Sequence, residues 1–206
     1  MKFPLRLLPV LCLLCSVPTA AQEPVTFAFS NPIQQESQTI RSIAQLQQIH
    51  ILENTITGRF SGRHYTLNIV RSLNGKEERT PLGEYACASD TLRFHIASQA
   101  AGTDSVQFTI PTPTGLACKH AIGNAPQCIL METYPEDTLT TTDTIPVMAF
   151  SPGKALEFTL PDGRIVRGMH YCSVRDGHFA PSEWHERFGL QDYIWFELNF
   201  IDETPH

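Results

Sequence analysis

Alternation of apolar and polar residues constrains this chain more than any other feature. Side chains on a β-strand point in turn to the two faces of a sheet, so a period of two residues indicates a strand with one dry face and one wet face. The pattern dominates the 206-residue sequence and is clearest in residues 25–30, 65–69, 92–96, 106–110 and 156–160. The sequence therefore predicts a protein built mainly from β-strands.

Turn-forming residues separate the alternating segments. Asn74-Gly75 and Pro152-Gly153 are two such breaks, and these residue types favour tight turns. The run Pro161-Asp162-Gly163 predicts a hairpin that pairs residues 156–160 with residues 165–174. About ten short strands arranged in this way favour an antiparallel β-sandwich, Ig-like or jelly-roll-like, with one or two short helices.

Two segments have helical character. Residues 37–48 carry a thin apolar stripe at helical spacing. Residues 182–188 are better delimited, because Ser182 is suited to begin a helix and Gly189 to end it. Both segments are therefore expected to be short helices within the β fold.

The residue spacing of the second helix predicts how it packs. Trp184 and Phe188 are four residues apart, so they share one face and are expected to pack onto the sheet. Glu183 and Arg187 have the same spacing and form a favourable ion pair, which leaves His185 and Glu186 facing solvent.

The beginning of the chain has the order of a secretory signal peptide. Lys2 and Arg6 precede the apolar run 7–14, and the small residues 16–21 follow it. We expect cleavage after Ala21, which would leave residues 22–206 as one β-sandwich domain. The protein is then exported, and is periplasmic, exposed at the cell surface or secreted.

Charge and hydropathy exclude two classes of partner. The chain has 15 Lys and Arg against 21 Asp and Glu, a formal net charge of −6, and no basic run. Such a chain is poorly suited to nucleic acid or to anionic lipid. Beyond the first 21 residues, no apolar run is long enough to span a membrane.

Four cysteines lie beyond the expected cleavage site, namely Cys87, Cys118, Cys128 and Cys172. An even number in an oxidising compartment suggests two disulfides. Three pairings are open, and the favoured one joins Cys118 to Cys128 and Cys87 to Cys172. Free buried thiols are the alternative, because a domain of this size does not need cross-links.

The strand at residues 193–201 is apolar on both faces and supplies the candidate binding residues. Trp195 shares a face with Asn199, beside Glu197. An indole ring can stack on a sugar while polar neighbours bind its hydroxyl groups. The sequence thus suggests a ligand site at Trp195, Asn199 and Trp184. Alternatively, the helix at 37–48 or the loop at 111–143 covers this face.

The residues around the second helix also suggest a rival, metal-dependent site. Imidazole groups of His170, His178 and His185 are suitable zinc ligands, and Glu183 or Glu186 would serve as a base in a metal-assisted hydrolase. No recognised metal-binding spacing supports this reading, so ordinary polar residues remain the alternative.

A three-residue pattern of Asp, a hydroxyl residue and an apolar residue occurs four times, at residues 90–92, 104–106, 137–139 and 143–145. It resembles the O-glycosylation acceptor of exported proteins in one group of Gram-negative anaerobes, and the chain resembles small secreted or periplasmic proteins of such bacteria. The resemblance implies an exported protein and no particular activity. The same triplet also occurs where a turn leads into a strand.

No nucleophile motif such as Gly-x-Ser-x-Gly and no phosphate-binding loop is present. The sequence therefore favours a non-catalytic binding or adhesion module with a glycan or protein ligand and no cofactor. The alternatives are the metal-assisted hydrolase and a disulfide-braced inhibitor or structural envelope protein.

Overall fold

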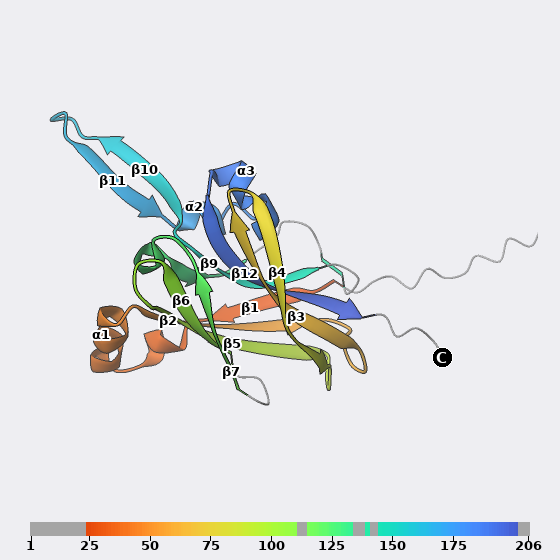
Figure 1. Ribbon diagram of the computed structural model, residues 1–206. Coiled ribbons are helices and arrows are strands. Elements are labelled where there is room, and N and C mark those ends of the chain that lie inside the picture. The colour runs from red at the N-terminus through yellow and green to blue at the C-terminus, as the bar shows by residue number, and fades with distance from the viewer. Residues whose placement is uncertain (1–23, 111–114, 134–138, 141–143, 202–206) are drawn as a thin grey trace, which may run out of the picture.

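The computed structural model describes residues 24–110, 115–133, 139–140 and 144–201. The expected signal peptide lies outside these ranges. The described chain is mostly strand, in two five-stranded antiparallel sheets and a separate two-stranded one (Figure 1). Sheet A has the order β1 (Thr26–Ser30), β2 (Ile49–Thr57), β5 (Thr91–Ala100), β6 (Ser105–Ile110), β7 (Leu116–Ala121). Sheet B has the order β4 (Lys76–Ala86), β3 (His64–Leu73), β12 (Asp192–Ile201), β9 (Ile145–Ser151), β8 (Ile129–Met131).

Alternating side chains from the two sheets form one apolar core between them. Ile56 and Ile96 enter it from sheet A, and Leu67 enters it from sheet B. The rings of Phe108 and Phe196 meet edge to face across the core, with centroids 5.1 Å apart, which is a favourable aromatic geometry. The prediction of an all-β, sandwich-like fold is therefore confirmed.

Strand β12 buries both of its faces, as its composition predicts. Its inner face contributes Ile194 and Leu198 to the core between the sheets. Its outer face contributes Tyr193 and Trp195 to a second cluster. The cover over this cluster comes from α2 (Cys172–Arg175), η3 (Pro181–Glu183) and α3 (Trp184–Phe188). Neither of the two segments that the sequence suggested, residues 37–48 or the described part of residues 111–143, is the main cover.

The helices agree with the sequence in position but not in every detail. Helix α1 (Gln38–Leu46) begins after Ser37, whose side chain accepts a hydrogen bond from the Ile40 amide. Helix α3 ends at Gly189 in the left-handed conformation. Ser182 does not cap that helix, because it lies within the 3-10 turn η3. Two further 3-10 turns are η1 (Pro32–Gln35) and η2 (Ala125–Gln127). Among the described residues, no helix is both long and apolar enough to cross a bilayer.

The predicted hairpin forms a two-stranded antiparallel ribbon, made of β10 (Lys154–Thr159) and β11 (Ile165–His170). We call residues 154–170 the ribbon. It pairs with neither five-stranded sheet and projects away from both (Figure 1). The second strand ends at His170 and not at residue 174, because helix α2 follows.

Two of the four Asp-hydroxyl-apolar triplets lead from a turn into a strand. The Asp90 carboxylate accepts hydrogen bonds from the Phe60 and Ser61 amides at 3.0 and 2.8 Å, and β5 begins at the next residue. Ser105 begins β6, is buried, and donates to Ala101 O. Residues 137–138 and 143 of the other two triplets lie outside the described residues.

The predicted disulfides are wrong, since all four cysteines are free. Cys87 is buried in the core between the sheets, whereas Cys172 is exposed at the start of α2. Cys128 is also buried in that core, and burial raises the pKa of its thiol to about 12. Cys118 lies on strand β7 and is half-buried against the same core. Burial keeps the Cys87 and Cys128 thiols protonated and unreactive.

Candidate functional site

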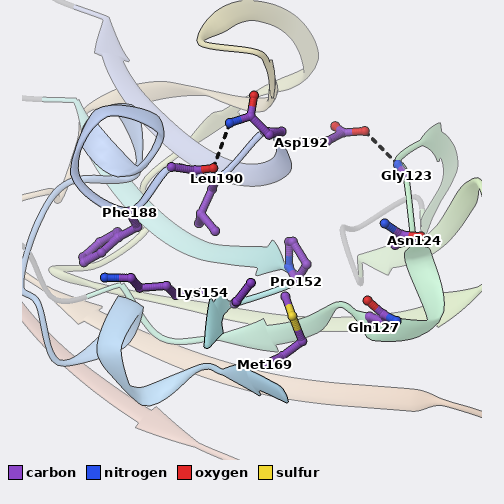
Figure 2. A pocket seen from close by; sticks show the side chains of 13 residues that line it. Gly123, Asn124, Gln127, Pro152, Lys154, Met169, Phe188, Leu190 and Asp192 are labelled. Atoms are coloured by element: carbon purple, nitrogen blue, oxygen red, sulfur yellow. Dashed lines mark hydrogen bonds between the residues drawn. The ribbon is translucent and has the colours of Figure 1, made fainter. Parts of the chain in front are cut away.

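A cavity of about 300 Å³ lies where the ribbon joins the two sheets (Figure 2). Three separate parts of the chain form it: the loop before η2, the root of the ribbon, and the turn from α3 into β12. The lining residues are Gly123, Asn124, Gln127, Pro152, Gly153, Lys154, Ala155, Met169, Phe188, Gly189, Leu190, Gln191 and Asp192.

Asp192 fixes one wall of the cavity. Its carboxylate accepts two hydrogen bonds from Arg71, at 2.9 and 2.8 Å, in a bidentate ion pair. The same carboxylate accepts the Gly123 amide at 2.7 Å (Figure 2). Charge-assisted bonds of this kind are the strong ones. Asp192 therefore ties the loop at residues 122–128 to sheet B.

The ribbon is tied to the same loop from the other side. The Tyr171 hydroxyl, directly after β11, donates to Gln127 O at 2.6 Å, and burial raises the pKa of the Tyr171 phenol. Because Gly153 has no side chain, the Tyr171 ring can lie close to its backbone. A Cβ atom there would lie 2.8 Å from the Tyr171 ring, and the residue has a φ of +73°. The root of the ribbon is thus held while its far end projects.

A second cavity of about 310 Å³ continues along the ribbon. It shares Gln127, Ala155 and Met169 with the first cavity. Its far end is marked by Glu157 and Arg167, which form an ion pair at 2.8 Å across the two strands. The two cavities adjoin at these shared residues, and we call them together the ribbon groove.

The ribbon groove is rich in amides and main-chain groups. Asn124, Gln127 and Gln191 carry side-chain amides, which both donate and accept hydrogen bonds. Met169 and Phe188 add apolar surface, and methionine adapts readily to different partners. The groove therefore offers both hydrogen-bonding and apolar contacts.

The residues proposed from the sequence as ligand-binding lie elsewhere, and two of them are buried. Trp184 is 1% exposed and Trp195 is 2% exposed. The Tyr193 ring lies between them, with its centroid 5.7 Å from each indole. Neither indole offers a face to a ligand in this conformation, so sugar stacking at Trp195 stays a prediction that requires the cover to move.

Asn199 is joined to Trp195 through a buried carboxylate. Glu197 accepts the Trp195 indole N–H at 3.0 Å and the Asn199 amide at 3.4 Å. Arg79 donates to the same carboxylate at 3.1 Å. Thr144 in turn donates to the Asn199 carbonyl oxygen at 2.7 Å. These bonds satisfy the buried polar groups of this face from within the protein.

The three histidines of the rival metal site do not come together. His170 bonds to Ser173, and His185 donates to Leu190 O at 2.7 Å. His178 is exposed and has a φ of +56°. Across the ranges that the structure describes, no group of three or more His, Cys, Asp or Glu residues is placed to hold a metal ion. The expectation that His185 faces solvent is also wrong, whereas Glu183 and Arg187 do pair, at 3.6 Å.

The sequence contained only an indirect indication of the ribbon groove. The glycine and proline residues at 152–153 and the hairpin turn predict the ribbon itself, but nothing local indicates that the loop at 122–128 lies beside it. Comparison of the chain with protein-family models, curated proteins and solved structures finds no match. The site and its geometry are therefore the basis for any functional conclusion.

Proposed function

We propose that this protein is an exported, non-catalytic binding module that holds an extended segment of a partner protein in the ribbon groove. The observation that carries the proposal is the position of this amide-rich groove between a projecting ribbon and a loop clamped by Asp192. The order of residues 1–21 supports export to the periplasm, the cell surface or the medium.

The chemistry of the groove favours a peptide. The side-chain amides of Asn124, Gln127 and Gln191 match the donors and acceptors of a main chain. Met169 and Phe188 offer apolar contacts for alternate side chains. Because the two adjoining cavities follow the length of the ribbon, the groove suits an extended segment better than a compact ligand.

Two considerations weigh against the other ligand and reaction classes. The groove residues include no Trp or Tyr, the side chains that best stack on sugars. Of its acidic residues, Asp192 is committed to Arg71 and Gly123, and Glu157 is paired with Arg167. Their present contacts leave neither carboxylate poised as a general base.

A display library of linear random peptides tests the proposal. We expect the protein with residues 1–21 removed to select peptides that bind reversibly. Binding should weaken at least about tenfold in Met169→Glu, because a charge then enters the apolar part of the groove. Gln127→Ala should also weaken binding, and it leaves the main-chain bond to Tyr171 intact.

Gln107→Ala is the matched control, since Gln107 is exposed on β6 of sheet A, outside the groove. Selected peptides that bind all three variants as well as the unaltered protein would overturn the proposal. A library without binders, together with retention on a glycan array, would favour a sugar ligand instead.

A further inference from the structure

The charges that line the ribbon groove do not balance. The charged side chains among its described lining residues are Lys154, Glu157, Arg167 and Asp192. Glu157 is paired with Arg167 at 2.8 Å, and Asp192 is paired with Arg71 at 2.8 Å. The Lys154 ammonium has no ion pair and no hydrogen bond to any described residue. The groove therefore carries one uncompensated positive charge.

Lys154 lies at the inner end of the groove. It lines the first cavity only, whereas Gln127 and Met169 line both cavities, and Glu157 lines only the second, farther along the ribbon. Figure 2 shows Lys154 across the first cavity from Gln127, with its side chain extending toward the Phe188 ring. The order along the groove is therefore Lys154, then the shared residues, then Glu157.

A chain that follows the groove inward has to end at its root. The ribbon projects away from both five-stranded sheets, and its root joins them (Figure 1). The first cavity lies at this root, where Pro152, Gly153 and the turn of residues 189–192 form its walls. A segment that runs from the tip to the root therefore meets the body of the sandwich, and its terminus lies beside Lys154.

We propose that the groove binds the carboxyl-terminal end of a partner protein, with the terminal carboxylate held by the Lys154 ammonium. The inference rests on the proposed function of the groove as a peptide site. Charge decides which end of the partner enters, because the ammonium attracts a terminal carboxylate and repels a terminal amine. Capture of a terminal carboxylate is a recurring mode of peptide recognition.

The residues next to Lys154 predict how the partner ends. Asn124 and Gln127 are exposed, and their side-chain amides make no hydrogen bond to another described residue. They can donate to the last peptide carbonyls of the partner. Met169 and Phe188 border the same cavity and fit an apolar side chain. The partner is therefore expected to end in an apolar residue with a free carboxylate.

Binding of synthetic peptides tests the inference. A pool of short random peptides with acetylated amino ends is made twice, once as free acids and once as carboxyl-terminal amides. Peptides retained by the protein without residues 1–21 are identified by mass spectrometry, and their affinities are measured by fluorescence anisotropy. Free acids should bind at least about tenfold more tightly than the same sequences as amides, because the amide removes the charge that faces Lys154.

Variants of Lys154 locate the source of this preference. Lys154→Gln should abolish the preference for acids, and Lys154→Arg should retain it. Lys76→Gln is the matched control, because Lys76 is exposed at the start of β4, outside the groove, and should leave the preference unchanged. Amides should still bind Lys154→Gln, which separates a lost charge from a lost fold.

The outcomes distinguish this inference from the proposed function. Equal binding of acids and amides by the unaltered protein would overturn the inference and leave the peptide function standing, as would a preference for acids that persists in Lys154→Gln. Amides that match the acids only when they contain Asp or Glu would assign an acidic side chain to Lys154 and refute the terminal assignment. If neither pool binds, the peptide function fails and the inference fails with it.

Discussion

Glu197 carries a carboxylate that is 2% exposed on the outer face of sheet B. Burying a charge is costly unless hydrogen bonds replace its water. Trp195, Asn199 and Arg79 supply those bonds here, and Arg79 supplies the only positive charge among them. The polar residues of this face thus bind one another, which assigns Trp195 to packing and not to an open ligand surface.

Substitution of Arg79 tests how much this positive charge stabilises the buried Glu197 carboxylate. Arg79→Ala should lower the free energy of unfolding by about 1–2 kcal/mol, because the buried carboxylate loses a charged partner while water reaches part of the gap. Urea denaturation measures the change. The control is Arg164→Ala, whose partner Asp162 is largely exposed, and its effect should stay within about 0.5 kcal/mol. Equal effects of the two substitutions would contradict the prediction.

At the scale of elements, the loop at residues 122–128 is held by contacts and not by its own sequence. Ile122 N and Ala125 N donate to main-chain carbonyls of the turn before β6, at Asp104 and Thr103. Asp192 holds the loop from the other side through the Gly123 amide. The wall of the groove is therefore formed in advance, which lowers the entropic cost of binding a partner segment.

Asp192→Asn tests this role of the loop contact. The amide keeps the size of the side chain but loses the charge that both Arg71 and the Gly123 amide use. We expect the free energy of unfolding to fall by about 1–3 kcal/mol and hydrogen exchange at the Gly123 amide to become faster. NMR-detected exchange measures the second effect. Asp162→Asn at the ribbon tip should change neither, and unchanged protection of Gly123 in Asp192→Asn would contradict the assignment.

The strands could be predicted from the sequence, but the groove could not. Strands β1, β3, β5, β6 and β10 follow from alternation, because that pattern is local. The groove depends on contacts between residues 69 and 44 positions apart, Gly123 with Asp192 and Gln127 with Tyr171, and no local pattern contains them. Likewise, alternation places Trp195 and Asn199 on one face, but it cannot show that the segment around α3 covers that face.

At the scale of the whole molecule, the two sheets form the core and the ribbon lies outside it. The core lies between the sheets, and no residue of the ribbon belongs to its described part. The molecule is thus a two-sheet sandwich from which one ribbon extends, with the ribbon groove at its root and along its strands. A binding function suits such a shape, because the ribbon can make contacts without disturbing the core.

Shortening the ribbon tests this division. We replace residues 156–168 by Asn-Gly, which joins Ala155 to Met169, a pair already opposite each other in the register, through a tight turn. The free energy of unfolding should change by less than about 1 kcal/mol, measured in urea, while peptide binding weakens because the lining of the second cavity is removed. The control replaces the tip alone, residues 161–163, by another turn. Unfolding of the shortened protein would show that the ribbon supports the sandwich.

The ribbon pairs with no other described strand, so its length can change without altering the pairing in either five-stranded sheet. Adding two residues to each strand would lengthen it by about 7 Å and leave every side chain on its present side. Adding one residue to each strand would exchange the two faces of the ribbon beyond that point. The reach of the protein can therefore change in steps of two while its interior stays the same.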